Sequence, residues 1–529
     1  MSSKGNYYIT TPIYYVTDAP HIGHLYTTVA TDVMARYQKM QGKDVWFLTG
    51  TDEHGQKIQK KAKETGETPQ ALADRVVQRY IEAWKLYNIQ YDDFIRTTEP
   101  RHGKVVQEYI ARLMKTGDIY LAEYEGWYCV PDETYWTESQ IIDGKCPDCG
   151  RTLEKLKEES YFFKMSAYAD RLLQYIQDHP DFIFPESRKN EVVGFLKGGV
   201  KDISVSRTTI QWGIPMPPDQ NANGRKATKE HKVYVWFDAL TNYISALGPL
   251  DGNPRYEKFW PEAIHVVGKD IIRFHAVYWP TFLMALKLPL PKKIVAHGWL
   301  TDSNRKISKS LGNMVDPIAL AKEVGVDGVR YFLFREFVFG MDGEYTKEVV
   351  YQRINSDLAN DYGNAVNRVT AMCLKYLGEG PLDASILSQS SELKSTAEEA
   401  VPLFHNELQG FNYNRALDQL WRLVSGVNRF IEVSAPWTLA KSSTPEDRKR
   451  LEMVLTHCHE SLRLASLLLL PFVPATAAKA LEYLGDGESV SAAIPVDHAR
   501  WGHGPKHPKV SKSQPLYPRL ELPKTPAPE

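Results

Sequence analysis

Residues 6–16 have the sequence Asn-Tyr-Tyr-Ile-Thr-Thr-Pro-Ile-Tyr-Tyr-Val, and this stretch, with the residues up to 50, decides the fold. Its aromatic and β-branched residues predict a first strand. After a turn at 17–20, apolar side chains recur at every fourth position, which predicts a helix ending near Gln41, with Gly42 just beyond. A short apolar run at 45–48 predicts a buried strand. Strand, helix and strand in this order predict a parallel α/β sheet. The helical stripe consists of Leu25, Val29, Val33 and Tyr37.

Three later apolar runs, at 234–237, 263–267 and 293–296, are typical of strands that return to the same sheet. Residues from about 118 to 230 break this rhythm with clustered cysteines, charged stretches and an exit rich in Gly, Pro and Asn. We interpret them as an inserted domain.

After about residue 350 the pattern is helical, with Pro402 and Pro436 as interruptions. The tail from His503 onward is rich in Pro and Lys, and we expect it to lie over the surface or to fray. The predicted division is a catalytic domain in two halves, an inserted domain and a helical domain. The two catalytic halves are residues 1–117 and 231–350, the inserted domain is 118–230, and the helical domain is 351–529.

Composition sets limits on the function. The chain has 529 residues, 43% of them hydrophobic, enough for about three domains. Lysine and arginine total 64 against 65 acidic residues, which excludes a strongly cationic nucleic-acid binder but allows a local basic face. The start lacks the apolar stretch of a signal peptide, and the longest apolar run, 462–473, contains Arg463 and is too short to span a bilayer. With only five cysteines, three of them clustered, a soluble cytoplasmic protein is expected.

The first motif with chemical potential is Pro20-His21-Ile22-Gly23-His24, at the junction of the first strand and helix. Backbone N–H groups at a helix start face anions, and Gly23 allows a nucleotide to approach the backbone. His21 and His24 can donate hydrogen bonds to phosphate oxygens from one helix face. Taken alone, the motif is equally compatible with a helix that begins with two surface histidines.

The second motif is Lys306-Ile307-Ser308-Lys309-Ser310, which follows the predicted strand at 293–296. Two ammonium groups and two hydroxyls on a loop suit a pyrophosphate leaving group. Alone, the motif is better explained as a solvated basic loop. Together and in this order, the two motifs resemble the signatures of class I aminoacyl-tRNA synthetases. The glycine-rich fingerprints of dinucleotide folds and P-loops are both missing from the sequence.

Further segments resemble the methionyl-tRNA synthetase family from about residue 6 to 520. They are Thr11-Pro12-Ile13-Tyr14-Tyr15, Gly50-Thr51-Asp52-Glu53-His54-Gly55-Gln56, Tyr234-Val235-Trp236-Phe237-Asp238-Ala239, and the stretch from Gly268 to His275. The resemblance implies a Rossmann-like parallel-sheet catalytic domain with an inserted zinc-knuckle-type domain, followed by a helical-bundle anticodon-binding domain.

Carried over residue by residue, the resemblance implies a substrate site. Asp52 pairs with the methionine ammonium group, and Asp270 holds the side-chain pocket in shape. The pocket consists of Ile13, Tyr15, Trp236, Ala239, Tyr243 and His275. Aromatic rings around a thioether are a favourable environment, but Tyr15 and Trp236 also suit ordinary core packing. The ATP site implied in the same way consists of His21, Gly23, His24, Lys306, Ser308 and Lys309, of which the two histidines and two lysines are catalytic.

A cysteine pattern predicts a metal knuckle. Cys129 and Asp132 are followed by Cys146 and Cys149, and paired ligands two residues apart on two turns can close a tetrahedral zinc site. Related enzymes carry a second cysteine where this chain has Asp132. A relic knuckle without metal is therefore the alternative.

The implied reaction is activation of L-methionine with ATP, accompanied by Mg²⁺, and transfer to the 3′-terminal adenosine of initiator and elongator tRNA(Met). In the helical region, Trp437 is implied to stack on an anticodon base, with Asn360 and Arg353 as possible partners of base edges. The alternative for Trp437 is a cap on the bundle core. A monomer is expected, since no extra tRNA-binding domain of the kind that dimerises relatives is evident.

Three other functions compete with this one. Synthetases for leucine, isoleucine or valine share both motifs but carry a larger editing insertion than the spacing of His24 and Lys306 allows. A small nucleotidylyltransferase would not need the long helical region. A catalytically inactive tRNA-binding protein would not need both histidines and both lysines.

Overall fold

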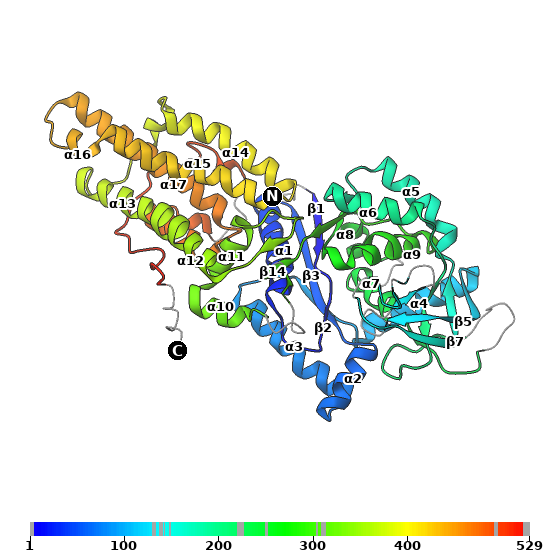
Figure 1. The fold of residues 1–529 in the computed structure, drawn as a ribbon. Coiled ribbons are helices and arrows are strands. Elements are labelled where there is room, and N and C mark those ends of the chain that lie inside the picture. Colours follow the sequence, from blue (N-terminus) through cyan, green and yellow to red (C-terminus); the bar gives the residue numbers. More distant parts are fainter. Residues whose placement is uncertain are drawn as a thin grey trace, which may run out of the picture.

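The computed structural model describes residues 5–129, 134–136, 141, 143–147, 150–218, 227–248, 252–302, 305–307, 314–490 and 496–521. Figure 1 shows an elongated molecule with a parallel sheet and its helices at the centre. A layer of helices lies at one end, and a smaller, mixed unit lies at the other. No helix among the described residues is long and apolar enough to cross a membrane.

The central sheet has seven strands in the order β2-β3-β1-β12-β13-β8, with β4 paired to β3. All six pairings are parallel, which confirms the predicted α/β class. The strands are β1 (Asn6–Thr10), β2 (Tyr14–Tyr15), β3 (Asp44–Asp52), β4 (Asp93–Arg96), β8 (Ile183–Phe184), β12 (Ala263–Gly268) and β13 (Lys293–His297). Strands β12 and β13 confirm the predictions at 263–267 and 293–296.

The predicted first strand at 6–16 is two strands in the structure. Pro12 has no N–H to donate to a ladder, so β1 ends at Thr10 and pairing resumes in β2. Strand β1 pairs with the first half of β3 and β2 with its last two residues. Helix α1 (Ile22–Met40) follows and ends as predicted, because Gly42 adopts a left-handed φ of 82°.

The strand predicted at 234–237 is wrong. A two-residue strand, β11 (Lys232–Val233), precedes this stretch, and helix α7 (Val235–Ser245) begins within it. Almost every side chain of α7 is buried, so the helix has no polar face to reveal its period. A short apolar run of this kind cannot be assigned to strand or helix from periodicity alone.

The inserted segment has its own antiparallel sheet in the order β6-β5-β7-β9. Its strands are β5 (Ile119–Cys129), β6 (Thr134–Trp136), β7 (Glu154–Phe163) and β9 (Ile203–Ser204). Between β7 and β9 the chain returns to the central sheet, where β8 pairs with β13. The boundaries 118–230 stay a prediction, because this range contributes a strand to both sheets.

Helices cover the sheet, and further helices form the helical region at the end of the molecule opposite β5 and β7 in Figure 1. Around the sheet they are α2 (Gln56–Thr65), α3 (Pro69–Leu86), α4 (Pro100–Thr116), α5 (Ala169–Asp178), α6 (Glu186–Lys197), α8 (Pro254–Phe259), α9 (Trp279–Ala285), α10 (Pro317–Val324) and α11 (Val326–Arg335). The helical region contains α12 (Lys347–Arg353), a π-helix at Ile354–Gly363, α13 (Asn364–Tyr376), α14 (Glu392–Gln409), α15 (Tyr413–Ser434), α16 (Pro436–Leu439), α17 (Pro445–Leu469) and α18 (Pro474–Tyr483). The predicted helical pattern after 350 is confirmed.

The two prolines expected to interrupt these helices behave differently. Pro436 begins α16 after Ala435, whose φ is 43°, so the interruption there is confirmed. Pro402 lies inside α14, and the helix continues through it, so this expectation is wrong. Pro402 and residue 398 are both exposed, so water can satisfy the carbonyl that loses its N–H partner.

A buried arginine joins the sheet layer to the helical region. Arg330 of α11 is fully buried and donates to Asp32 Oδ2 of α1 at 2.7 Å. It also donates to the carbonyls of Pro471 and Phe472, which follow α17, at 2.8 and 2.9 Å. All three acceptors are buried protein groups. Arg330 therefore joins α1 of the sheet layer to the end of α17 in the helical region.

The described part of the tail lies over the surface, as predicted, where it contacts α10 and the π-helix. The Tyr517 hydroxyl donates to the Val324 carbonyl at 2.7 Å, and the backbone of Leu520 exchanges two hydrogen bonds with the Asn355 side chain.

Candidate active site

The two histidines of the first motif close the N-terminus of α1. His21 is the N-cap, and its Nδ1 accepts from the Gly23 N–H at 3.0 Å. His24 Nδ1 accepts from the His21 N–H at 3.2 Å. The rings stack with centroids 3.7 Å apart. The motif is therefore a capping box made by imidazoles instead of the usual Ser/Thr and Glu.

This cap fixes the chemistry of both rings. A backbone N–H can only donate, so Nδ1 of each neutral ring is an acceptor and the ring proton is on Nε2. A Cβ at Gly23 would lie 2.9 Å from His21 Cε1, so a side chain there would displace the His21 ring. The sequence predicts that Gly23 allows a nucleotide to approach the backbone. The contact with His21 is a second reason for glycine.

The segment that follows the second motif reaches the start of α1. The Ile22 N–H donates to the Val315 carbonyl at 3.2 Å, and Val315 follows the second motif closely in the chain. In addition, His297 Nε2 at the end of β13 is 2.7 Å from Thr27 Oγ1 of α1. Lys306 belongs to β15 (Arg305–Lys306), which pairs with β14 (Leu300–Asp302). The predicted residues Ser308 and Lys309 lie outside the described residues.

Asp52 and Tyr15 are direct neighbours. They are register partners between β3 and β2, and Asp52 is 3% exposed. Asp52 is the last residue of β3, whereas the sequence placed it just past the strand. It therefore lies at the carboxyl edge of a parallel sheet, where open α/β sheets bind ligands. The Lys57 ammonium group is 4.6 Å from the Tyr15 ring centroid.

The other residues predicted to bind methionine gather around α7 and the segment after β12. Trp236 stacks on Phe274 with ring centroids 3.7 Å apart and lies 6.4 Å from the His275 ring. Tyr243 Oη is 2.7 Å from His275 Nε2. Ala239 is buried on the same helix, and Ile13 is partly buried in the same core. Asp270 lies in a short 3₁₀ turn after β12, where a Cβ at Gly268 would meet its carboxylate.

Burial keeps this cluster uncharged, and hydrogen bonds fix the positions of its protons. His275 Nδ1 is 2.9 Å from the Ile271 carbonyl, which only accepts, so the proton is on Nδ1. Nε2 is then the acceptor of the Tyr243 hydroxyl. Burial lowers the pKa of His275 to about 4 and raises the pKa of Tyr243. At neutral pH both groups are therefore neutral, which suits an apolar, polarizable ligand.

A buried carboxylate on the same helix, α7, was not predicted from the sequence. Asp238 accepts from His54 Nδ1 at 2.7 Å and from His102 Nε2 at 2.6 Å. Burial favours its neutral acid, but the two histidines hold the pKa of Asp238 down at about 2. The signal was present in the sequence, because an aspartate inside an otherwise apolar run needs a buried partner.

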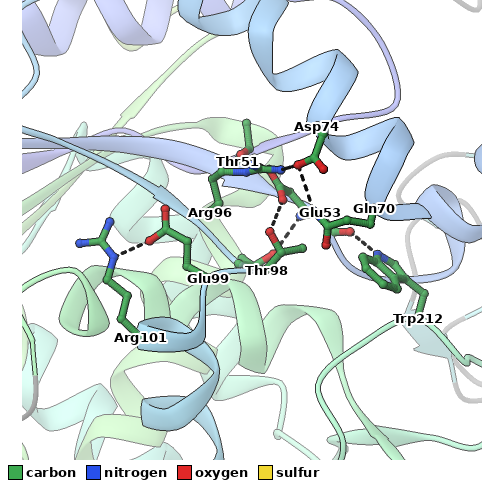
Figure 2. Close-up of polar contacts among 10 residues, drawn as sticks. Thr51, Glu53, Gln70, Asp74, Arg96, Thr98, Glu99, Arg101 and Trp212 are labelled. Carbon is green, nitrogen blue, oxygen red and sulfur yellow. Dashed lines mark hydrogen bonds and ion pairs between the residues drawn. The ribbon is translucent and has the colours of Figure 1, made fainter. Parts of the chain in front are cut away.

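A second missed carboxylate is Glu53, directly after Asp52. Figure 2 shows the polar side chains that converge on it, among them Arg96 and Thr98. A pocket of about 330 Å³ lies beside this loop, lined by His54, residues 97–100, the first turns of α4 and residues 213–215. It contains none of the residues predicted to bind methionine.

Two of the four predicted metal ligands are described. Cys129 and Cys146 are both buried in one small core with Trp136 and Leu153. The Cys146 carbonyl accepts from the Gly150 N–H at 2.8 Å, and Gly150 has a left-handed φ of 69°. Asp132 and Cys149 lie outside the described residues. Within the described part of the chain, no group of three or more ligand-type side chains is assembled.

The predicted anticodon residues lie in different surroundings. Trp437 of α16 is 38% exposed, so it does not fill the bundle core. Figure 1 places α16 at the outer end of the helical region, far from β2 and β3. Asn360 is exposed on the π-helix. The Arg353 guanidinium group pairs with Glu336 and Asp357 at 2.8 and 3.7 Å.

Near the start of α16, Arg368 of α13 pairs with Glu432 of α15, three residues before Ala435.

Comparisons with known proteins agree with this architecture. A family model described as "tRNA synthetases class I (M)" matches residues 7–157 and 149–370. The chain is 47% identical to a methionine–tRNA ligase of Caldanaerobacter subterraneus, over 98% of this chain and 80% of that protein. It is 48% identical to the ligase of Bacillus subtilis, over 98% and 78%.

The solved structures give the same result. Mycobacterium tuberculosis methionyl-tRNA synthetase bound by methionyl-adenylate superposes with a TM-score of 0.88 and 39% sequence identity. That match covers 97% of this chain and 100% of the other. The free form of the same enzyme gives a TM-score of 0.83 at 37% identity. The family model matches more than half of the chain, and relatives align along nearly all of it. The chain therefore belongs to the methionyl-tRNA synthetase family of class I aminoacyl-tRNA synthetases.

Proposed function

We propose that the chain is a methionine–tRNA ligase. It activates L-methionine with ATP to methionyl-adenylate, releases pyrophosphate, and transfers the methionyl group to the 3′-terminal adenosine of tRNA(Met). The observation that carries this proposal is the histidine-capped start of α1, where the Ile22 N–H donates to the carbonyl of Val315 in the segment that follows the second motif. Membership of the methionyl-tRNA synthetase family supports the choice of substrates.

In the first step, an oxygen of the methionine carboxylate attacks the α-phosphorus of ATP, and the bond to the pyrophosphate oxygen breaks. We propose that His21 and His24 donate Nε2–H to ATP phosphates, because both Nδ1 atoms already accept from the backbone. Gly23 keeps the His21 ring in place. Lys306, Ser308 and Lys309 would stabilise charge on the α-phosphate and the departing pyrophosphate. The step needs positioning and charge stabilisation, with no covalent enzyme intermediate.

The methionine site is proposed at the carboxyl edge of β3 and β2. Asp52 would pair with the substrate ammonium group, and the neutral cluster around Tyr243 and His275 would hold the thioether side chain. Trp236, Ala239, Ile13 and Tyr15 complete the proposed pocket, with Asp270 at its rim.

Two metal ions belong to the proposal. Mg²⁺ bound to ATP would neutralise charge on the phosphates. Zinc would be held by Cys129, Asp132, Cys146 and Cys149 as a structural ion of the inserted domain. Two observations support this: the two described thiols share one small core, and the Cys146 carbonyl accepts from the Gly150 N–H.

The partner of the second step is tRNA(Met). We propose that its anticodon loop contacts the outer end of the helical region, where Trp437 is exposed, and that Asn360 and Arg353 contribute contacts. We further propose that the protein acts in the cytoplasm as a monomer.

An ATP–pyrophosphate exchange assay across the amino acids tests the activation step. We expect exchange with methionine and none with leucine, isoleucine or valine. Exchange that is faster with one of those three would contradict the proposed pocket.

A further inference from the structure

A buried carboxylate cluster lies directly behind Asp52. The Glu53 side chain is 0% exposed, and its two oxygens accept three side-chain hydrogen bonds. Thr51 Oγ1 and Arg96 Nε donate to Oε1, each at 2.7 Å, and Thr98 Oγ1 donates to Oε2 at 2.5 Å. Figure 2 shows these groups converging on Glu53 from β3, β4 and the residues that follow β4.

The backbone of Glu53 is fixed as well. Its N–H donates to Thr97 Oγ1 at 2.9 Å, and its carbonyl accepts from Trp212 Nε1 at 2.6 Å. Both peptide groups of this residue are therefore held by side chains from other segments. Together with the carboxylate contacts, they leave the chain at residue 53 little freedom to move.

Side chains along a strand alternate between the two faces of the sheet. Thr51 and Glu53 share one face, as their hydrogen bond shows, so Asp52 between them points to the other. On that side lies Tyr15, the register partner of Asp52. The carboxylate cluster therefore fixes the residues on both sides of Asp52 without reaching the substrate side itself.

We propose that Glu53 is a positioning residue for methionine binding: its buried carboxylate holds the end of β3 so that Asp52 meets the substrate ammonium group. This inference rests on the role proposed above for Asp52. Glu53 is not a catalytic residue, because its carboxylate is enclosed by protein donors.

Asp74, at the exposed side of the cluster, offers a control variant. Arg96 Nη2 also contacts Asp74 Oδ1 at 2.5 Å, and Asp74 is 52% exposed on α3. Asp74 pairs with the same arginine but makes no contact with Glu53 among the described interactions. A change at Asp74 alters the charge around Arg96 without releasing residue 53.

The test measures methionine-dependent ATP–pyrophosphate exchange for Glu53→Gln, Thr98→Val and the control Asp74→Asn. Displacement of a binding group can cost up to about 100-fold. For Glu53→Gln we expect a rise of about 10-fold in the methionine KM, with the ATP KM within about twofold of the wild type. Valine has nearly the same shape as threonine but lacks the hydroxyl donor. Thr98→Val should therefore raise the methionine KM by about threefold. Asp74→Asn should change neither constant.

A double-mutant cycle with Asp52→Asn separates positioning from general stability. If Glu53 acts through Asp52, Glu53→Gln should add little to the methionine KM once Asp52 is replaced. Additive effects in the cycle would overturn the inference. So would an unchanged methionine KM in Glu53→Gln, or equal losses for methionine and ATP accompanied by a lowered Tm.

The same experiment distinguishes this inference from the function it rests on. If Asp52→Asn alone leaves the methionine KM unchanged, the ammonium site is wrongly assigned. If Asp52→Asn raises that KM but Glu53→Gln does not, the positioning role alone is wrong.

Discussion

Replacing His21 with asparagine and with alanine should separate its two roles. The His21 Nδ1 atom caps α1 through the Gly23 N–H at 3.0 Å, whereas the Nε2–H is proposed to contact ATP. An asparagine side-chain oxygen occupies nearly the same place as Nδ1 and is a preferred N-cap, but it has no group at the position of Nε2. Alanine removes both contacts.

The expected magnitudes follow from these contacts. Loss of an N-cap hydrogen bond costs about 1 kcal/mol, which is about a fivefold change in the local opening equilibrium. Loss of one donor to charge that develops in the transition state costs about 10²–10³-fold in rate. Both His21→Asn and His21→Ala should therefore slow adenylate formation by about 10²–10³-fold. Only His21→Ala should also weaken the first turn of α1.

Two assays are needed. ATP–pyrophosphate exchange reports the activation rate, and amide hydrogen exchange over residues 18–30 reports the opening of the first turn. His21→Asn should combine slow activation with protection like that of the wild type. Near-normal activation in His21→Asn would show that Nε2 does not contact the reacting phosphates. Unchanged amide protection in His21→Ala would refute the capping argument instead.

Four further outcomes are expected. Asp52→Ala should weaken methionine use while the fold survives, because the substrate ammonium group loses its ionic partner; unchanged methionine kinetics would place the ammonium site elsewhere. Elemental analysis of metal-replete protein should find about one zinc per chain, and a chain without zinc would favour a relic knuckle. Trp437→Ala should reduce aminoacylation of tRNA, with a loss of about 1–3 kcal/mol of stacking, but leave tRNA-independent exchange nearly intact. A parallel fall in exchange and Tm would instead assign Trp437 to structure. Finally, the pKa of His275 is lowered to about 4 by burial, so the unfolded chain binds a proton there between about pH 6.5 and 4 while the folded chain does not. Stability should therefore fall as the pH drops through this window, and a Tm that is independent of pH there would contradict a buried neutral His275.

Much of the fold could be predicted, because its strongest signals are local. Helix α1 has an apolar stripe and ends at Gly42, where the left-handed φ favours glycine. Strands β3, β12 and β13 are short apolar runs in a βα alternation, and the parallel sheet followed from that order. The helical region after 350 also followed from its period.

The features that could not be predicted depend on contacts between distant segments. Strand β8 joins the central sheet from within the inserted segment, and nothing in its two residues indicates its partner β13. Helix α14 continues through Pro402 because that position faces water. Apart from Thr51, the partners of Glu53 come from β4, the residues after it, and Trp212, so most of its buried hydrogen bonds could not be anticipated from the sequence around it.

The wrong assignment of 234–237 bears directly on the predicted methionine pocket. On a strand, Trp236 and Ala239 are three residues apart and would point to opposite faces of the sheet. On a helix, positions 236, 239 and 243 follow the spacing i, i+3 and i+7 and share one face. Because α7 is a helix, Trp236, Ala239 and Tyr243 can all line one pocket. Asp238 points elsewhere and is held by His54 and His102. His54 follows Asp52 closely in the chain, so the helix that carries the proposed pocket is bonded to the loop beside the proposed ammonium site.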